Sequence, residues 1–327
     1  MRIGLIDIDY NGSFPNIPLM KISAWHKLHR NTVEFYMPFT DRYDIVYISK
    51  IFSWSEDYQD VINADKVIRG GSGYAIELQD GRETWNGYGE NLPVYIEHIY
   101  PDYSLYPTLT KDTAYGFLTR GCPRGCDFCH VSAKEGQRSV KVADLDEFWR
   151  GQKNIVLCDP NILACKDRME LLQQLIESQA YIDINQGLDA RMLDEDVCSM
   201  LECIKMRDIH FAWDRWQDKD MILQKLELFM RTGIVTRHGH KGIVYTLVNF
   251  DTTIDQDLER IYTLRDMGYM PYVMIYDKAH AAPVYTELAC WANNKYKINA
   301  CPRFDQYMHN YKRLDDYQKL QLYINDL

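Results

Sequence analysis

Short apolar runs alternate along this chain with segments whose apolar residues recur every three or four positions. The runs are typical of buried strands, and the periodic segments are typical of amphipathic helices. After residue 113 the predicted strands are Tyr115–Thr119, Asn154–Cys158, Tyr181–Asn185, Ile209–Trp213, Ile243–Val248 and Pro271–Tyr276. The predicted helices between them are Arg168–Ser178, Glu195–Met206 and Ile254–Met267. Repeated strand–helix units predict parallel strands, here an open, partial (β/α)6 TIM-type barrel over residues 106–280.

The first hundred residues show the same alternation on a smaller scale. Strands are predicted over Arg2–Asp7, Val33–Tyr36 and Ile45–Ile48, and helices over Pro18–His29 and Glu56–Ala64. This pattern predicts a small Rossmann-like α/β domain over residues 1–105. We expect His26 and His29 on the exposed side of the first helix, and irregular structure over Gly81–Pro93.

The two ends of the barrel segment set the predicted domain boundaries. The aromatic-rich segment Pro101–Pro107 is predicted to be a linker packed on the barrel, with the boundary near residue 105. Residues 281–327 are predicted to form a C-terminal extension. Within it, Tyr296–Ala300 is interpreted as an edge strand and Leu314–Asn325 as a polar helix.

Composition narrows the class of protein. With 327 residues, 46% hydrophobic and 26% charged, the chain can build a large soluble core. A net charge of −10 argues against broad non-specific binding to nucleic acid. No apolar run approaches the ~20 residues that a membrane span needs, and the start of the chain does not resemble a signal peptide. Nine cysteines, an odd number, indicate a reducing compartment, so we expect a cytoplasmic protein without a membrane partner.

The strongest chemical signal is the loop Gly121–Cys129, in which Cys122, Cys126 and Cys129 have the spacing Cys-x3-Cys-x2-Cys. Thiolates are soft ligands suited to zinc or to iron–sulfur clusters, and a closed [4Fe–4S] cluster takes four of them. Three ligands on one loop can hold three irons and leave the fourth open. The alternative is a zinc site with His130 as fourth ligand, although structural zinc sites usually combine two separated ligand pairs.

The spacing of these cysteines resembles the cluster loop of the radical S-adenosylmethionine (SAM) superfamily. The resemblance covers residues 114–276 and implies a [4Fe–4S] cluster whose open iron binds SAM. It also implies a one-electron reductant such as flavodoxin or ferredoxin, reductive cleavage of SAM, and a 5′-deoxyadenosyl radical that abstracts a hydrogen from substrate. Phe128 matches the aromatic residue that lies near the adenine in that family.

A barrel of this kind places its active site at the carboxyl ends of the strands. After the second strand come Asp159 and Asn161, where the family often has Gly-Gly-Glu. We expect them to bind the SAM ammonium group and to add a hydrogen bond. After the third strand, Arg191 is predicted to bind the SAM carboxylate, and Gln186 or Asp189 the ribose hydroxyls. The alternative for Arg191 is an ion pair with Asp189.

Some polar residues have a simpler structural interpretation. Asp144 and Asp194 directly precede periodic segments and are predicted to be helix N-caps, and the segment Asp251–Thr253 is predicted to cap the helix that starts near Ile254. His238 and His240 precede the fifth strand, at the opposite end of the barrel, and are not expected to be ligands.

The loop Asp7–Gly12 is similar to the Asp-x-His-x-x-Gly loop of cobalamin-binding domains, but Asp9 replaces the cobalt-ligating histidine. We therefore do not expect bound cobalamin. Two functions remain as alternatives to a radical SAM enzyme without cobalamin. One is a cobalamin-dependent radical SAM methyltransferase, and the other is a non-catalytic metal-binding module. The substrate class stays open among peptide, nucleic acid and small molecule. An RNA-modifying activity is not favoured, because the sequence shows no appended RNA-binding domain.

Overall fold

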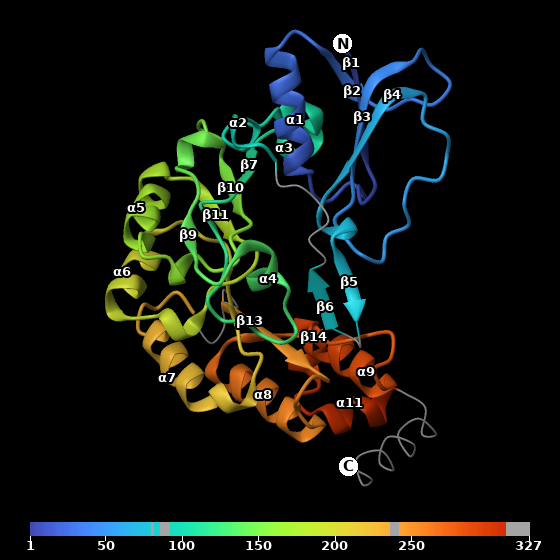
Figure 1. Cartoon of the computed structure of the whole chain (residues 1–327). Coiled ribbons are helices and arrows are strands. Elements are labelled where there is room, and N and C mark those ends of the chain that lie inside the picture. The colour runs from blue at the N-terminus through green and yellow to red at the C-terminus, as the bar shows by residue number, and fades with distance from the viewer. Residues whose placement is uncertain (80–81, 86–91, 236–241, 312–327) are drawn as a thin grey trace. The chain divides into compact units, whose positions relative to one another are not determined.

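The computed structural model describes residues 1–79, 82–85, 92–235 and 242–311 (Figure 1). By its contacts the chain divides into two compact units, Met1–Ile182 and Asp183–Leu327. The predicted division into three parts at residues 105 and 280 stays a prediction. The predicted tail helix over 314–325 and the two histidines at 238 and 240 lie outside the described residues.

The first unit begins with a parallel four-stranded sheet of order β2-β1-β3-β4. Its strands are β1 (Arg2–Asp7), β2 (Thr32–Phe35), β3 (Tyr43–Ser49) and β4 (Ala64–Gly70). Alternate residues of β1 point to opposite faces, so Ile3 and Leu5 pack against helix α1 (Ile17–Leu28), while Ile6 packs on the other side. The predicted α/β arrangement with parallel strands is thereby confirmed.

Helix α1 begins at a cap that the sequence contains. Asn16 Oδ1 accepts a hydrogen bond from Leu19 N at 3.1 Å, and Pro18 occupies the first turn. The prediction that His26 is exposed is wrong, because this side chain is 1% exposed and lies 3.0 Å from the hydroxyl of Tyr47. Burial lowers the pKa of His26 to about 4, so the buried imidazole is neutral at pH 7.

The predicted helix over Glu56–Ala64 is wrong, because the chain between β3 and β4 is irregular and covers the second face of the sheet with Tyr58 and Ile62. The Asp57 carboxylate accepts hydrogen bonds from Tyr58 N, Arg69 Nε and Tyr74 Oη. Short acidic side chains that bond their own backbone compete with helix formation. The prediction of irregular structure over Gly81–Pro93 is wrong in part, because β6 (Arg82–Trp85) pairs there with β5 (Ile76–Gln79).

The segment after the N-terminal sheet anchors it to the second half of the same unit. It contains α2 (Val94–Glu97), the single turn Tyr103–Leu105 and α3 (Pro107–Thr110). The Tyr106 hydroxyl donates to Asp7 Oδ2 at 2.6 Å, and the Tyr103 hydroxyl donates to Phe148 O at 2.6 Å. Ile17, Met20 and Tyr106 share one core cluster with the strand residue Tyr115 and with Cys158.

The second half of the first unit builds a three-stranded sheet of order β11-β10-β7. Its strands are β7 (Thr113–Gly116), β10 (Asn154–Leu157) and β11 (Tyr181–Ile184), the last of which crosses the boundary between the units. Strands β7 and β10 are parallel, and helix α5 (Arg168–Ser178) lies between β10 and β11 in the chain. A short antiparallel pair, β8 (Thr119–Arg120) with β9 (Val140–Lys141), brackets the cysteine loop, which includes α4 (Val131–Glu135).

The second unit contains a parallel sheet of order β12-β13-β14 with helices between its strands. Its strands are β12 (Ile209–Ala212), β13 (Gly242–Val248) and β14 (Met270–Ile275). Its helices are α6 (Glu195–Cys203), α7 (Lys219–Met230), α8 (Ile254–Met267), α9 (Pro283–Ala292), α10 (Lys295–Ala300) and α11 (Phe304–Tyr311). All six strands and three helices predicted after residue 113 are present, although no closed barrel forms among the described residues.

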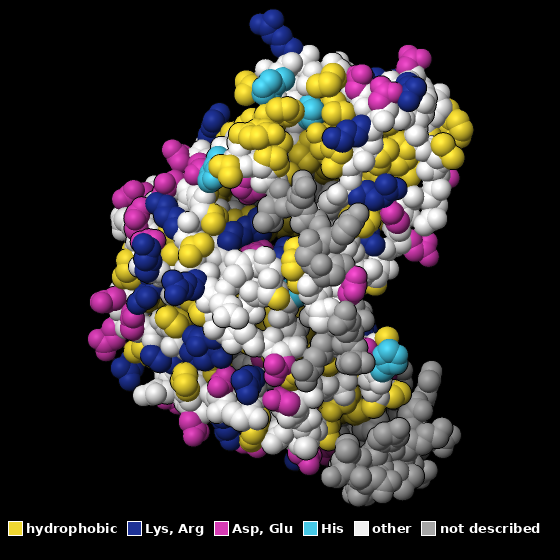
Figure 2. Space-filling view, in the orientation of Figure 1, with side chains coloured by type: hydrophobic (Ala, Val, Ile, Leu, Met, Phe, Trp, Pro, Cys, Tyr) yellow, Lys and Arg dark blue, Asp and Glu magenta, His cyan; other side chains and the backbone are white. Residues whose placement is uncertain are grey.

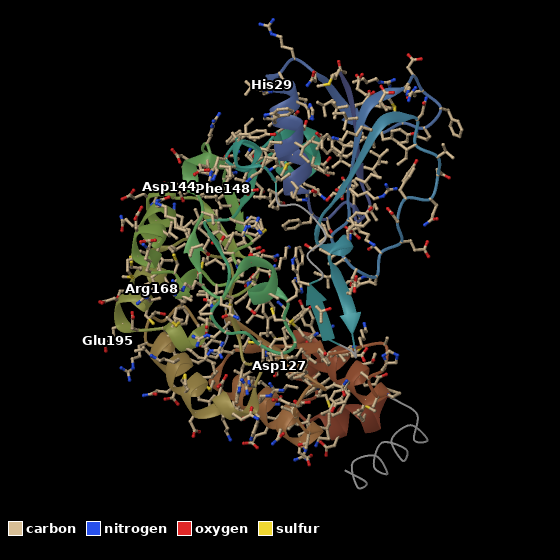
Figure 3. The ribbon with its side chains drawn as sticks, in the orientation of Figure 1. His29, Asp127, Asp144, Phe148, Arg168 and Glu195 are labelled. Carbon is tan, nitrogen blue, oxygen red and sulfur yellow. The ribbon has the colours of Figure 1, made fainter. Side chains whose placement is uncertain are left out.

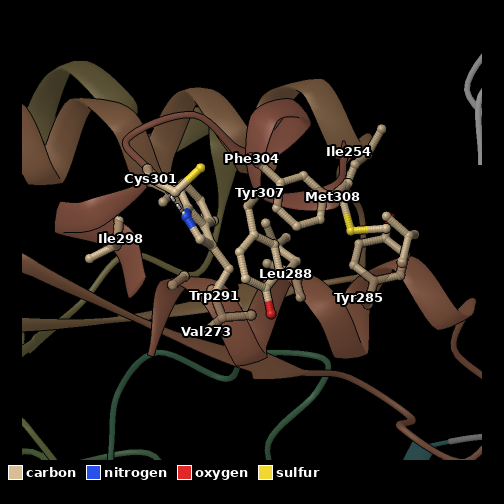
Figure 4. Packing of buried hydrophobic residues seen from close by; sticks show 14 residues of the cluster. Ile254, Val273, Tyr285, Leu288, Trp291, Ile298, Cys301, Phe304, Tyr307 and Met308 are labelled. Carbon is tan, nitrogen blue, oxygen red and sulfur yellow. Dashed lines mark hydrogen bonds between the residues drawn. The ribbon is translucent and has the colours of Figure 1, made fainter. Parts of the chain in front are cut away.

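The edge strand expected over Tyr296–Ala300 is instead helix α10, so that prediction is wrong. Asn294 caps this helix, since its side chain accepts from Tyr296 N and Lys297 N. The helix packs in an apolar cluster with α8, α9 and α11, which Figure 4 shows from close by. At its centre the Trp291 indole is fully buried and donates to Cys301 O at 2.8 Å.

The surface of the first unit carries a group of exposed apolar side chains near α1 and α2 (Figure 2). Leu28, Val94 and Tyr95 are 72%, 75% and 64% exposed. Among the described residues, no helix is long and apolar enough to cross a membrane.

Candidate functional site

The three loop cysteines follow the end of β7, where the chain leaves the edge of the parallel β7–β10 pair. The pair β8–β9 brings the two ends of residues 121–139 together. Cys122 N donates to Gly136 O at 3.1 Å, and Glu135 binds Arg120 Nη1 at 2.9 Å and Gly121 N at 3.3 Å. These bonds close residues 121–139 into a compact loop, the cysteine loop, in which Asp127 is labelled in Figure 3.

All three cysteine side chains of the loop are partly exposed, and Phe128 is partly buried beside them. Cys129 N donates to Cys126 O at 3.0 Å, which makes a tight turn between the second and third thiols. Among the described residues, no three His, Cys, Asp or Glu side chains are already grouped as a metal ion requires. The fit to a metal therefore rests on the donor set, since three thiols on one accessible loop suit an iron–sulfur cluster or zinc.

Two glycines give this loop its path. Gly121 has a φ of +84°, and a Cβ there would lie 2.2 Å from Arg138 O. Gly125, between the first and second cysteines, has a φ of +56° but nothing within 4 Å of a Cβ. Gly121 is thus required both for its backbone conformation and for the close approach of two chain segments, whereas Gly125 is required only for its conformation.

Asp159 lies directly after β10 and is fully buried. Its carboxylate accepts hydrogen bonds from Leu118 N, Thr119 N and Thr119 Oγ1. Burial raises the pKa of Asp159 to about 6, although these hydrogen bonds act in the opposite direction. The carboxylate ties the end of β10 to the start of the cysteine loop, and its contact with a SAM ammonium group stays a prediction.

Asn161 is the predicted residue that contacts the cysteine loop directly. Its side-chain amide lies 3.6 Å from Cys122 Sγ, as a donor to sulfur, and its Oδ1 accepts from Ala164 N. Ser139 Oγ, at the far end of the loop, donates to Asn161 O at 2.7 Å. Asn161 is 4% exposed, so the first cysteine of the loop is contacted by a buried side chain.

Gln186 and Arg191 belong to the second unit. Gln186 is exposed in the turn after β11. The Arg191 guanidinium donates to Asp189 at 2.7 Å and to Asp218 at 3.0 Å, so the alternative of a pair with Asp189 is confirmed. Its contact with a SAM carboxylate stays a prediction.

The predicted N-caps are found where the sequence indicates them. Asp194 accepts from Val197 N at 2.8 Å, and Thr253 accepts from Gln256 N at 3.3 Å. Asp144 caps the short helical turn Leu145–Glu147 in a capping box. These three side chains therefore stabilise helix starts.

The structure adds residues that sequence reasoning missed. Lys134, on α4, donates to Ser72 Oγ at 2.7 Å, and burial lowers its pKa. In the second unit Arg260 is fully buried and binds the carbonyls of Trp213, Asp214 and Leu247. The spacing Asp257-x-x-Arg260 could have predicted an ion pair of Arg260 with Asp257, because residues three apart meet on a helix. Lys134 had no comparable signal, since its partner is 62 residues away.

The loop Asp7–Gly12, which is similar to a cobalamin-binding loop, offers no imidazole to ligate cobalt. Asp9 offers a carboxylate in place of imidazole, and it already accepts hydrogen bonds from Ile51 N, Phe52 N and Ser55 Oγ. Gly71 and Gly73 approach the carbonyls of Lys50 and Phe52 so closely that a Cβ would lie 2.3 and 2.6 Å from them. Asp9 and the two glycines therefore contact residues 50–55 of the protein's own chain.

No protein-family model matches this chain, and a search of curated proteins finds no significant match.

Proposed function

We propose that this chain is a radical SAM enzyme that cleaves S-adenosylmethionine reductively and abstracts a hydrogen atom from its substrate. The observation that carries the proposal is the Cys-x3-Cys-x2-Cys loop at the carboxyl end of β7, anchored by residues that follow the adjacent parallel strand β10. Active sites of parallel α/β folds lie at this end of the strands. Bound through Cys122, Cys126 and Cys129, a [4Fe–4S] cluster supplies the single electron for this chemistry.

We further propose that the two three-stranded sheets belong to one partial (β/α)6 barrel. The six predicted strands occur in the expected order, and the pairs β7–β10, β12–β13 and β13–β14 are parallel. Leu188 also forms a bridge to Phe211 of β12. In such a barrel Gln186 and Arg191 follow the third strand, on the same end as the cysteine loop.

The protein's own groups have defined tasks in this proposal. Asn161 directs an amide N–H at the sulfur of Cys122, and hydrogen bonds to the sulfurs are one way a protein sets a cluster potential. Asp159 holds the backbone at the start of the loop. The partly buried ring of Phe128 supplies apolar surface for the adenine that the family resemblance implies. A reductant of the flavodoxin or ferredoxin class and a cytoplasmic location complete the proposal.

The test is anaerobic reconstitution of the full chain with iron and sulfide, followed by dithionite and SAM. We expect about four irons per chain, absorbance typical of a cluster, and 5′-deoxyadenosine as product. Cys126→Ser should lose the cluster and the product, because only two loop thiols remain. Cys203→Ser, at the exposed end of α6, is the matched control and should retain both.

Zinc binding at about one ion per chain without iron would contradict the proposal and favour a non-catalytic metal-binding module. Cluster formation without any cleavage of SAM would also overturn it.

A further inference from the structure

The β12–β13–β14 sheet of the second unit has one face covered by its own helices and one face that these helices leave open. On the covered face, Phe211 of β12 packs edge-on against Phe229 of α7, with 5.0 Å between ring centroids. The alternate side chains point the other way. The side chains of this open face that matter here are His210, Tyr245, Tyr272 and Met274.

Aromatic rings cross the open face from strand to strand. His210 and Tyr245 are stacked, with 5.3 Å between centroids and 4° between planes. Tyr272 meets Tyr245 edge-on at 5.7 Å and 76°. Gly187, at a φ of +81°, lies close to Tyr245, where a Cβ would be 3.3 Å from the ring. The central ring is therefore fixed, while Tyr272 and Met274 remain 44% and 46% exposed.

Asp183 lies next to His210, and the facing polar atoms of these two side chains have no hydrogen-bond partner. Asp183 Oδ1 and His210 Nδ1 are 3.9 Å apart, beyond hydrogen-bonding distance, and both atoms are buried without a hydrogen-bond partner. The Asp183 side chain as a whole is half exposed, and burial of its inner oxygen raises its pKa. Buried polar atoms without partners are uncommon and call for a specific cause, such as a bound molecule that reorganises them.

The chemistry of the open face selects its occupant. Exposed rings and a thioether favour a flat aromatic ring. A carboxylate accepts hydrogen bonds only, so it matches a ring edge that presents N–H donors and no acceptor. The open-face positions of β12, β13 and β14, within the described residues, carry no Lys or Arg that would hold a phosphate. Guanine has adjacent ring N–H and amino donors, whereas adenine has an acceptor next to its amino group.

We propose that the open face of the second unit binds a guanine-type ring, with Tyr272 and Met274 against the ring and Asp183 on its donor edge. That the bound ring belongs to the substrate rests on the proposed function; the binding itself does not. Tyr245, stacked on His210, holds that ring next to the Asp183 carboxylate.

The test measures binding of guanosine to the full chain by equilibrium dialysis, with no cluster or SAM added. We expect saturable binding that weakens about 10–100-fold in Asp183→Asn and about 5–50-fold in Tyr272→Ala. Inosine, which lacks the amino group, should bind at least about 5-fold more weakly. Tyr296→Ala, the same substitution on exposed α10 away from the open face, should bind as the wild type does.

Absence of saturable binding, equal binding of inosine, or unchanged binding in both open-face variants would overturn the inference. Thermal unfolding of each variant confirms that it is folded, and Met274→Ala replaces Asp183→Asn if that variant does not fold. Guanosine binding without SAM cleavage would leave this inference standing and reject the proposed enzyme. SAM cleavage without guanosine binding would do the reverse.

Discussion

At the scale of single residues, Asp159 links burial to the predicted site. Its carboxylate is fully buried, and its three donor groups are 40 and 41 residues away in the chain. The sequence placed this residue after the second predicted strand, which is where it lies. It did not indicate that the carboxylate accepts hydrogen bonds from the backbone of Leu118 and Thr119, because that contact depends on how the parallel strands β7 and β10 pair.

The pH dependence of stability tests this assignment. Burial raises the pKa of Asp159 to about 6, so the folded protein binds this proton more tightly than the unfolded chain does. Its contribution to stability is therefore fully present below about pH 4 and is lost as pH rises to about 6. Asp214 should act with the same sign, because burial raises its pKa to about 6 as well.

We expect the difference in unfolding free energy between wild type and Asp159→Asn to change by about 2 kcal/mol between pH 4 and pH 7, with the variant gaining relative stability at pH 7. Urea unfolding at each pH measures it. Asp127→Asn, an exposed change in the same loop, should follow the wild-type curve. A change of opposite sign in Asp159→Asn would mean that the hydrogen bonds outweigh burial.

At the scale of elements, hydrophobic periodicity predicted three helices after residue 113 but not α7 and α9, which also bury one face. Helices Arg168–Ser178 and Ile254–Met267 have the predicted bounds, because each has a continuous apolar stripe and a distinct end. The helix expected over 56–64 and the strand expected over 296–300 were wrong because hydrogen bonds from side chains to nearby backbone determined the structure there. Asp57 bonds nearby backbone in a loop, and Asn294 starts a helix.

The cysteine loop is the element with the sharpest structural requirement. A Cβ at Gly121 would collide with Arg138 O, so Gly121→Ala should open the loop closure and cost several kcal/mol. We expect iron content after reconstitution to fall by about half or more. Gly125→Ala is the matched control, since it has a positive φ but open space, and should cost only about 1 kcal/mol and retain iron. Equal iron loss in both variants would show that the closure at Gly121 is not what matters.

Arg260 joins helix α8 to the carboxyl ends of β12 and β13. Replacing it with methionine removes these bonds and leaves the buried Asp257 with Thr252 Oγ1 but without its cationic partner. We therefore expect Arg260→Met to lower the free energy of unfolding by about 3–5 kcal/mol. Arg265→Met, on the same helix but with exposed partners at Asp266 and Pro302 O, should cost only about 1 kcal/mol. Urea titration compares the two, and similar losses would contradict the assigned role of Arg260.

At the scale of the whole molecule, the sequence predicted α/β architecture and parallel strands, and both are present. It predicted a boundary near residue 105 from composition alone. The core cluster that includes Met20, Tyr106 and Tyr115 crosses this position, and Tyr106 also binds Asp7 of β1. Such long-range contacts leave no periodic signal in the sequence.

Two neighbouring residues of α1 test whether the N-terminal sheet is independent of the strands that follow. Met20 is fully buried in the cluster that crosses residue 105, whereas Leu19 packs in the core between α1 and the N-terminal sheet. Each substitution by alanine should cost about 2–5 kcal/mol. Hydrogen exchange should then differ: Met20→Ala should raise exchange in β7 as well as in β1, whereas Leu19→Ala should act mainly on β1 and β3. If Met20→Ala leaves β7 unchanged, residues 1–105 form an independent domain, and the shared cluster does not couple them to the cysteine loop.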